Sequence, residues 1–223
     1  MPTPKKSTTS VDASVVAAHY QNSVDLAYAT WKDRNKLFVA LVLTAGLGLL
    51  LLLQVPTTDS LLVAAIAKFL NITDPTAREN LLKTFPFDIL LSGVLVSMFY
   101  LMQRLYSTNL SVMRTFIYLG ALEDEIRGYL GLSADSISFT REGKFYWGKR
   151  TFTQKISKWY YVIVLFVILI PFMFFKLRAD FAQANWLITS VDLIVSLMTA
   201  FYWREYARSS VSLDVPNVQD EVK

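Results

Sequence analysis

The residues best suited to carry chemistry form a polar stripe that begins at Asn185 and continues through the otherwise apolar stretch from Trp186 to Trp203. They recur at spacings of four, three, four and three, which places them on one face of an α-helix. The stripe consists of Asn185, Thr189, Asp192, Ser196 and Thr199. If the two tryptophans mark the two membrane interfaces, Asp192 lies near the middle of the bilayer. A carboxyl group at that depth must be protonated, paired or in contact with water, so Asp192 should face protein or an aqueous path.

Two interpretations of this intramembrane polar stripe remain open. In one, Asp192 binds or relays a cation or a proton, or forms a switchable contact between protomers. In the other, a protonated Asp192 donates a hydrogen bond to hydroxyl groups of a neighbouring span and only holds helices together. Hydroxyl-rich faces inside helix bundles are more often of the second kind.

Nothing else in the sequence indicates catalysis. The phosphate-binding, dinucleotide-binding, zinc-protease and serine-hydrolase motifs are all absent. The chain has no cysteine, which excludes thiolate metal sites, and its one histidine, His19, is a residue type that is more often structural when alone. The run Glu123–Glu125 is best interpreted as a solvated helix face. We therefore expect a protein that is not an enzyme, with no catalytic residue, no metal site and no cofactor.

Four apolar runs, of which only the fourth contains an acidic or basic residue (Asp192), must position the polar stripe. They cover Leu37–Leu53, Ile89–Met102, Trp159–Phe175 and Trp186–Trp203 in a chain that is 53% hydrophobic. Each approaches the ~20 residues that a helix needs to cross ~30 Å of hydrocarbon. Because lipid offers the backbone no hydrogen bonds, such runs should be helices. The sequence thus predicts four spans.

The basic residues predict the orientation of these spans. Of the 22 lysines and arginines, 17 lie before the first span, between the second and third, or after the fourth. The positive-inside rule then places both termini in the cytoplasm. The remaining five, which include Lys176 and Arg178, fall in two outer loops, and Asp180 belongs to the second of these loops. There is no short basic segment ahead of the first span of the kind found in a cleavable signal peptide.

Two of the spans should continue below the membrane as helices. Nothing between Ala13 and Leu53 stops a helix, and no proline occurs between Phe87 and Leu130, after which Gly131 ends the pattern. We expect an all-α fold, an integral membrane four-helix bundle with the N-terminal and second-span helices extending into the cytoplasm. The expected layout is a disordered tail (1–11), the N-terminal helix and first span (12–54), an external loop with short helices (55–85), the second span and cytoplasmic helix (86–131), a basic aromatic segment (132–158), the third and fourth spans (159–208) and a polar tail (209–223).

Small residues on two spans indicate close helix packing. Gly93 and Ser97 on the second span, and Ala40, Thr44 and Gly48 on the first, have the spacing that lets another helix approach closely.

The segment 132–158 combines basic and aromatic side chains next to a span. Such a composition can bind nucleic acid, but on the cytoplasmic side of a membrane it favours anionic lipid head groups. The residues expected to contact lipid are Arg141, Lys144, Lys149, Arg150, Lys155 and Lys158. The expected partners are therefore the bilayer and its anionic lipids rather than nucleic acid.

Two parts of the chain resemble known families. The stretch Tyr118–Ile126, followed by Thr140–Lys144 and by a span kinked at Pro171, resembles a group of uncharacterised bacterial multi-span membrane proteins. This resemblance covers about the middle third of the chain. More loosely, the helix Tyr20–Lys36 that runs into a span is similar to SLATT-type membrane effector domains. Both resemblances imply a bacterial inner-membrane protein.

The leading functional expectation is a non-enzymatic inner-membrane protein that self-associates and serves as a scaffold or pore-forming element. The alternative is a small ion or proton channel or transporter that uses Asp192. A third possibility is an accessory subunit of a membrane complex.

Overall fold

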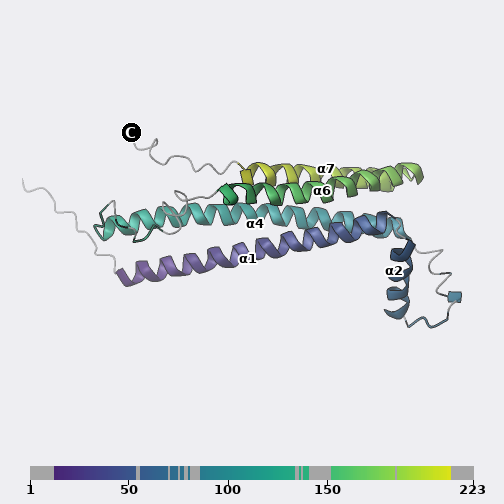
Figure 1. Cartoon of the computed structure of the whole chain (residues 1–223), viewed down its shortest axis with the longest axis horizontal. Helices are drawn as coiled ribbons and strands as arrows, with labels where there is room; N and C mark the ends of the chain where they lie inside the picture. The colour runs from purple at the N-terminus through teal and green to yellow at the C-terminus, as the bar shows by residue number, and fades with distance from the viewer. Residues whose placement is uncertain are drawn as a thin grey trace, which may run out of the picture. The chain divides into compact units, whose positions relative to one another are not determined.

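The computed structural model describes residues 13–53, 56–69, 71–74, 76–77, 80, 86–133, 136, 138–140, 152–183 and 185–211. Within these ranges the chain forms five α-helices and no strand. The helices, labelled in Figure 1, are α1 (Ala13–Leu52), α2 (Pro56–Phe69), α4 (Phe87–Tyr129), α6 (Phe152–Gln183) and α7 (Trp186–Val211). The predicted all-α fold class is confirmed.

Four of these helices, α1, α4, α6 and α7, are long and apolar enough to cross a membrane. By length and composition this is a multi-pass membrane protein. With 40 and 43 residues, α1 and α4 are uninterrupted helices. At 1.5 Å per residue each is about 60 Å long, roughly twice the thickness of the hydrocarbon layer. The prediction that both spans continue as helices beyond the membrane is therefore confirmed.

The chain forms two compact units, and both contain part of α1 and part of α4. One, here called the paired-helix unit, comprises residues 1–33 and 108–152. The other, the bundle unit, comprises residues 34–107 and 153–223. The charge-bearing stripe of the fourth span belongs to the bundle unit.

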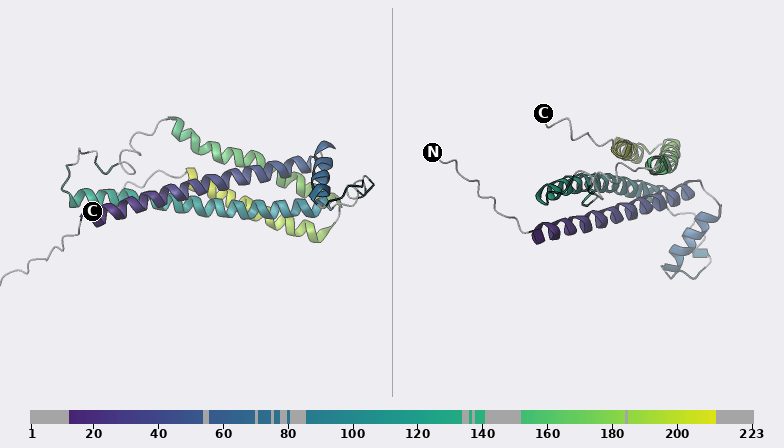
Figure 2. Two further views of the ribbon diagram at one scale, coloured as in Figure 1. Left: turned by 90° about the horizontal axis from the view of Figure 1, so that it is seen from below. Right: turned by 60° about the vertical axis from the view of Figure 1, so that its left-hand side comes forward.

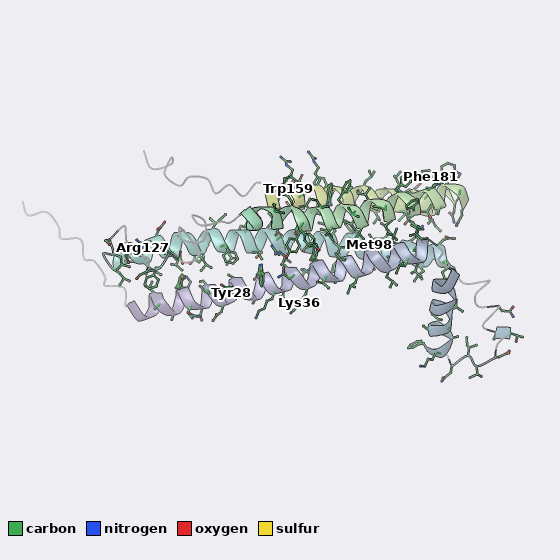
Figure 3. All side chains as sticks on the ribbon, in the orientation of Figure 1. Tyr28, Lys36, Met98, Arg127, Trp159 and Phe181 are labelled. Atoms are coloured by element: carbon green, nitrogen blue, oxygen red, sulfur yellow. The ribbon has the colours of Figure 1, made fainter. Side chains whose placement is uncertain are left out.

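The core of the bundle unit is built from regularly spaced apolar residues. On α4 the buried face has spacings of four, three, four and three, and it consists of Leu91, Leu95, Met98, Met102 and Leu105. Against it pack Leu41 and Ala45 of α1 and Leu165, Leu169 and Phe172 of α6. Figure 3 labels Met98 within this layer. The large apolar stripe, rather than the small residues beside it, decides which side of α4 faces inward.

Glycine allows α1 to approach its neighbours closely at one point. A Cβ atom on Gly48 would lie 2.7 Å from Cε2 of Phe172 and 2.8 Å from Cγ1 of Val94. The structure thus places Gly48 where the small-residue pattern on the first span expects close contact, whereas Ala40 and Thr44 are only half-buried. Only a residue without a side chain fits at position 48.

Substituting Gly48 tests this contact. Gly48→Ala should destabilise the protein by about 1–3 kcal/mol because the fully buried Phe172 ring must move. Gly46 is the matched control, since a Cβ there meets nothing within 4 Å. Gly46→Ala should stabilise the helix by about 0.5–1 kcal/mol. Unfolding in one detergent, followed by circular dichroism, measures both, and equal midpoints for the two variants would contradict the assignment.

The predicted small-residue face of α4 lies on the outside of the bundle unit. A Cβ atom on Gly93 meets nothing within 4 Å, and Ser97 is exposed, with its hydroxyl donating to the Gly93 carbonyl at 2.8 Å. Among the described residues, no helix of this chain packs closely on that face. Close packing at Gly93 and Ser97 therefore remains a prediction, and the helix that packs there would belong to another chain.

In the paired-helix unit, polar side chains join α1 to α4. The Tyr20 hydroxyl donates to Oε1 of Glu123 at 2.7 Å, and Nε2 of His19 lies 2.7 Å from the Tyr118 hydroxyl. Glu123 is buried, while Asp124 and Glu125 are exposed. The interpretation of this acidic run as one solvated face is wrong for Glu123, because the Tyr20 hydroxyl satisfies its carboxylate inside the helix pair.

The end of α4 is fixed by its last turn. Gly131 has φ +59°, and the amide of Leu132 donates to the Arg127 carbonyl at 3.1 Å, as in a Schellman motif. The Arg127 guanidinium in turn donates to the backbone carbonyls of Ser133, Ser136 and Ser138 at 2.6–2.9 Å. The predicted stop at Gly131 is confirmed.

A short helical stretch starts in the segment between α2 and α4. The Asp74 carboxylate accepts hydrogen bonds from the Thr76 hydroxyl at 2.6 Å and from the Thr76 amide at 3.1 Å. These bonds, the hydroxyl first, hold the pKa of Asp74 below its ordinary value of 3.8. Asp74 therefore has the hydrogen bonds of a helix N-cap.

Candidate functional site: a buried lysine and two aspartates

Three helices of the bundle unit contribute to one buried group of ionisable side chains. Asp192 comes from α7, Lys176 and Asp180 lie one turn apart on α6, and Ser92 comes from α4. We call these four residues the charge cluster. The prediction that the third span ends at Phe175 and that Lys176, Arg178 and Asp180 lie in a loop is wrong. The helix continues to Gln183 because the ionisable groups on its inner side are paired within the protein.

Lys176 connects the two aspartates of the charge cluster. Its Nζ atom lies 2.8 Å from Oδ2 of Asp192 and also forms an ion pair with Oδ1 of Asp180. Lys176, Asp180 and Asp192 are 1%, 3% and 1% exposed, so the cluster is shielded from its surroundings. A charge in such a place is tolerated only with a partner. Lys176 is therefore the partner that Asp192 requires in the membrane.

The charge count of the cluster is odd. One ammonium group and two carboxylates carry a net charge of −1. Burying an unbalanced charge is costly, and the cost disappears if the cluster holds one additional proton or one cation. Counted with all three groups ionised, the cluster therefore lacks one positive charge.

Ser92 connects the charge cluster to α4. Its oxygen lies 2.6 Å from Oδ2 of Asp192 and 3.0 Å from the backbone carbonyl of Asp88. A hydroxyl group has one proton and cannot donate to both acceptors at once. The single hydroxyl proton of Ser92 is therefore shared between the Asp192 carboxylate and the Asp88 carbonyl.

The predicted polar stripe divides between the inside and the outside of the bundle unit. Thr189, Asp192, Ser196 and Thr199 are buried, and Asn185 is exposed. The hydroxyls of Thr189 and Thr199 donate to carbonyls four residues earlier on α7, at 2.9 and 2.8 Å. Among the described residues the hydroxyl of Ser196 has no hydrogen-bond partner. Among the described residues of the stripe, Asp192 is the one whose side chain forms polar contacts with other helices, and the buried hydroxyl of Ser196 has no partner there.

The charge cluster lies toward one end of the bundle unit. The link between α6 and α7, the start of α4 and the link from α1 to α2 are all at the same end in Figure 1, and we call it the α2 end. The two views in Figure 2 show α2 turned away from the direction of the four long helices there. Asp192 follows the start of α7 by six residues, about 9 Å along the helix. Phe181, labelled in Figure 3, marks the part of α6 that carries the cluster.

The other side of the cluster is closed by the apolar core. Met98, Leu165 and Leu169 lie one to three turns farther from the α2 end and are fully or almost fully buried. Beyond them aromatic rings pack around α7, with Phe166 against Trp203 and Tyr106 against Tyr202. In this conformation the cluster is occluded.

Most of the residues predicted to bind lipid lie outside the described part of the chain. Arg141, Lys144, Lys149 and Arg150 lie outside the described residues. Lys155 and Lys158 belong to the first turns of α6. Within the described part of the chain there is no group of three or more His, Cys, Asp and Glu side chains that could hold a metal ion.

Sequence reasoning found Asp192 but missed Lys176, Asp180 and Ser92. The signal for the first two was their spacing of four residues directly after an apolar run, which on a helix lets a lysine and an aspartate pair. Two ionisable residues at the end of an apolar run have the same local appearance as the start of a loop. Nothing in the local sequence around Ser92 indicated a contact with Asp192.

The fold and the charge cluster define a multi-pass α-helical membrane protein with a buried ionisable site between its spans. No family model, no curated protein and no solved structure matches the chain.

Proposed function

We propose that this protein is a small carrier that moves protons or monovalent cations across the membrane, with the charge cluster as its binding site. The observation that carries the proposal is the odd charge count around Lys176. Ionisable residues inside spans are costly and mark ion or proton paths. A cluster whose neutral state needs one more positive charge is suited to take up and release that charge. A transporter was the alternative functional expectation from the sequence, and the partners of Asp192 now favour it over the scaffold.

The occluded position of the cluster favours a carrier over an open pore. An open pore would expose its charged residues to water from both sides, whereas the three ionisable residues here are almost fully buried. Release to either side therefore requires a conformational change. Pro171 lies five residues before Lys176 within α6. Because proline removes one helical hydrogen bond, the segment that carries Lys176 and Asp180 can tilt at this position.

Proton flux into liposomes tests the proposal. Purified full-length protein is reconstituted into vesicles that contain a pH-sensitive dye, and a potassium gradient with valinomycin sets the membrane potential. We expect proton uptake well above the leak of protein-free vesicles when the interior is negative, and proton release when it is positive. If wild-type vesicles only leak like protein-free ones, with both sodium and potassium as the main cation, the carrier proposal fails.

We place the protein in a bacterial inner membrane with both termini in the cytoplasm, on the basis of the basic residues and the family resemblance. On this proposal the segment 132–158 contacts anionic lipid, and the protein is not an enzyme.

Reporter fusions test the topology. Fusions after Leu132 and Val215 should report a cytoplasmic location, and a fusion at Asp74 an external one. A fusion inserted at Asn185, in the link between α6 and α7, should also be external. Asp180, although close in sequence, is unsuitable for a fusion because it is buried inside the bundle unit. An external signal at Leu132 would reverse the proposed orientation.

The outer face of α4 favours a second candidate function, a self-associating scaffold. Gly93 and Ser97 are exposed there, and a small-xxx-small pair that faces lipid lets two spans approach closely. If two copies pair through this face, Gly93→Leu should shift crosslinked protein from dimer to monomer. Gly46→Leu is a control on a different helix. A dimer that persists in Gly93→Leu would remove the support for this candidate.

A further inference from the structure

The central turns of α2 are apolar on every side, including the side that faces away from the protein. Each residue from Leu61 to Ala67 is apolar. Val63 and Ala67, one turn apart, are buried, whereas Ala64 is exposed. Phe69, in the last turn, is 89% exposed, the highest value among the described large apolar side chains. A helix on a water-facing surface would carry polar residues there, so the exposed side of α2 suits an apolar surrounding.

The position of α2 places it where a span ends. It begins at Pro56, four positions after Leu52, the last residue of α1. Four residues extend at most ~14 Å, so α2 starts close to the end of that span. It lies across the direction of the spans of the bundle unit rather than along it (Figures 1 and 2). With 14 residues it is also shorter than the ~20 that cross the hydrocarbon layer. A helix with this position and direction lies parallel to the membrane surface.

Aromatic side chains of α6 and α7 mark the same boundary of the membrane. Trp186 begins α7 and is 70% exposed, and its ring lies 6.4 Å from the exposed ring of Phe181 on α6. Tryptophan is enriched where spans pass from hydrocarbon to head groups. The link between α6 and α7 is at the α2 end of the bundle unit (Figure 1). The α2 end is therefore the level at which the spans leave the hydrocarbon layer.

The last turn of α2 pairs its backbone groups within the chain. The amide of Ile72 donates to the Ala67 carbonyl at 2.7 Å, and the amide of Asn71 donates to the Lys68 carbonyl at 3.3 Å. Asn71 has φ +56°, the left-handed conformation of a Schellman motif. Carbonyl groups that would otherwise need water at a helix end are thus paired. This end of α2 can lie against hydrocarbon without loss of hydrogen bonds.

We propose that α2 is an interfacial helix that lies on the lipid bilayer at the α2 end, between head groups and acyl chains, with Phe69 and the exposed apolar side of its central turns in contact with lipid. This surface continues the lipid-facing surface of the spans, which is likewise apolar and exposed. Lys68, exposed beside Phe69, can extend its ammonium group to lipid phosphates. The proposal depends neither on the carrier function nor on which side of the membrane the α2 end faces.

Spin labels on single cysteines test the position of α2. The chain contains no cysteine, so each variant carries one label at a known site. Phe69→Cys is labelled with a nitroxide, which is itself largely apolar, in full-length protein in vesicles of phosphatidylcholine and phosphatidylglycerol. Its collisions are measured with oxygen, which dissolves in lipid, and with a water-soluble nickel chelate. Thr73→Cys, at an exposed position after the end of α2, is the matched control. The ratio of oxygen to nickel collisions should be severalfold higher at position 69 than at position 73.

Two labels on α7 calibrate the depth. Leu187→Cys lies in the first turn of α7, and Leu197→Cys lies ten residues later, about 15 Å along the helix. Both positions are exposed, at 75% and 62%. The label at position 69 should be as deep as the label at position 187 and shallower than the label at position 197.

Two results would overturn the proposal. Nickel collisions as frequent at position 69 as at position 73 would place α2 in water. A label at position 69 that is shielded from both oxygen and nickel would place Phe69 against another protein, such as a second copy of this chain. Ala65→Cys, at an exposed position of the same helix, repeats the measurement with Phe69 in place, so that the outcome does not depend on the loss of its ring.

Discussion

Asp192→Asn is expected to reduce proton flux in vesicles to the leak of protein-free ones, while the protein remains folded. The amide has nearly the shape of the carboxyl group, so it can still accept the contact from Lys176 and bond to Ser92. It cannot take up or release a proton, and it leaves a cluster of one ammonium group and one carboxylate that is already neutral. The variant therefore loses the charge change on which transport depends. The fluorescence of a pH-sensitive dye enclosed in the vesicles measures the loss of proton flux.

The matched control for this variant is Asp25→Asn. Asp25 is exposed on α1, where its carboxylate accepts a hydrogen bond from Gln21 at 3.2 Å. The same chemical change there should leave flux at the wild-type level. Thermal unfolding in detergent shows whether both variants are folded. Equal flux from wild type and Asp192→Asn would eliminate the carrier, and the charge cluster would then serve only to hold helices together.

Lys176→Met is expected to lower the free energy of unfolding by about 3–5 kcal/mol, the usual cost of removing one partner from a buried ion pair. Methionine fills a similar volume, so the loss reports the charge rather than a cavity. Without the ammonium group two buried carboxylates face each other across α6 and α7. Denaturant unfolding at neutral pH measures the loss.

Two further variants separate the effect of the lost charge from a general sensitivity of α6 to substitution. Arg178→Met changes an exposed basic residue two positions away and should alter stability by no more than about 0.5 kcal/mol. The triple variant Lys176→Met, Asp180→Asn, Asp192→Asn contains no charge and should recover most of the stability that Lys176→Met loses. If Lys176→Met were as stable as Arg178→Met, Lys176 would not lie between two ionised carboxylates.

The sequence alone determined the features that depend on local pattern. Four long apolar runs predict four apolar helices because the hydrocarbon layer fixes the length of a span. The absence of proline and the apolar spacing predicted that α1 and α4 continue as single helices, and Gly131 predicted where α4 ends. Asp192 and its stripe were visible for the same reason, since a helix face is defined by residues three or four positions apart.

Tertiary structure alone decided which polar residues lie inside. Glu123 is buried because Tyr20, 103 residues away in the chain, donates to it. The inward side of α4 is set by large apolar residues that find partners on α1 and α6, so Gly93 faces outward while Gly48 is in close contact. Neither outcome follows from the spacing of small residues along one helix.

The charge cluster shows the physical reason most clearly. Whether Lys176 ends a span or stays within it depends on the free energy of burying its charge, and that depends on partners elsewhere in the chain. Asp180 would pair with Lys176 even if both residues lay in an exposed loop, so this local partner does not decide whether Lys176 is buried. Asp192, on the next helix, and Ser92, 100 residues before it, supply the contacts that bring the ammonium group inside. A local pattern can show that a residue is ionisable, but the partners that make its burial possible are brought together only by the fold.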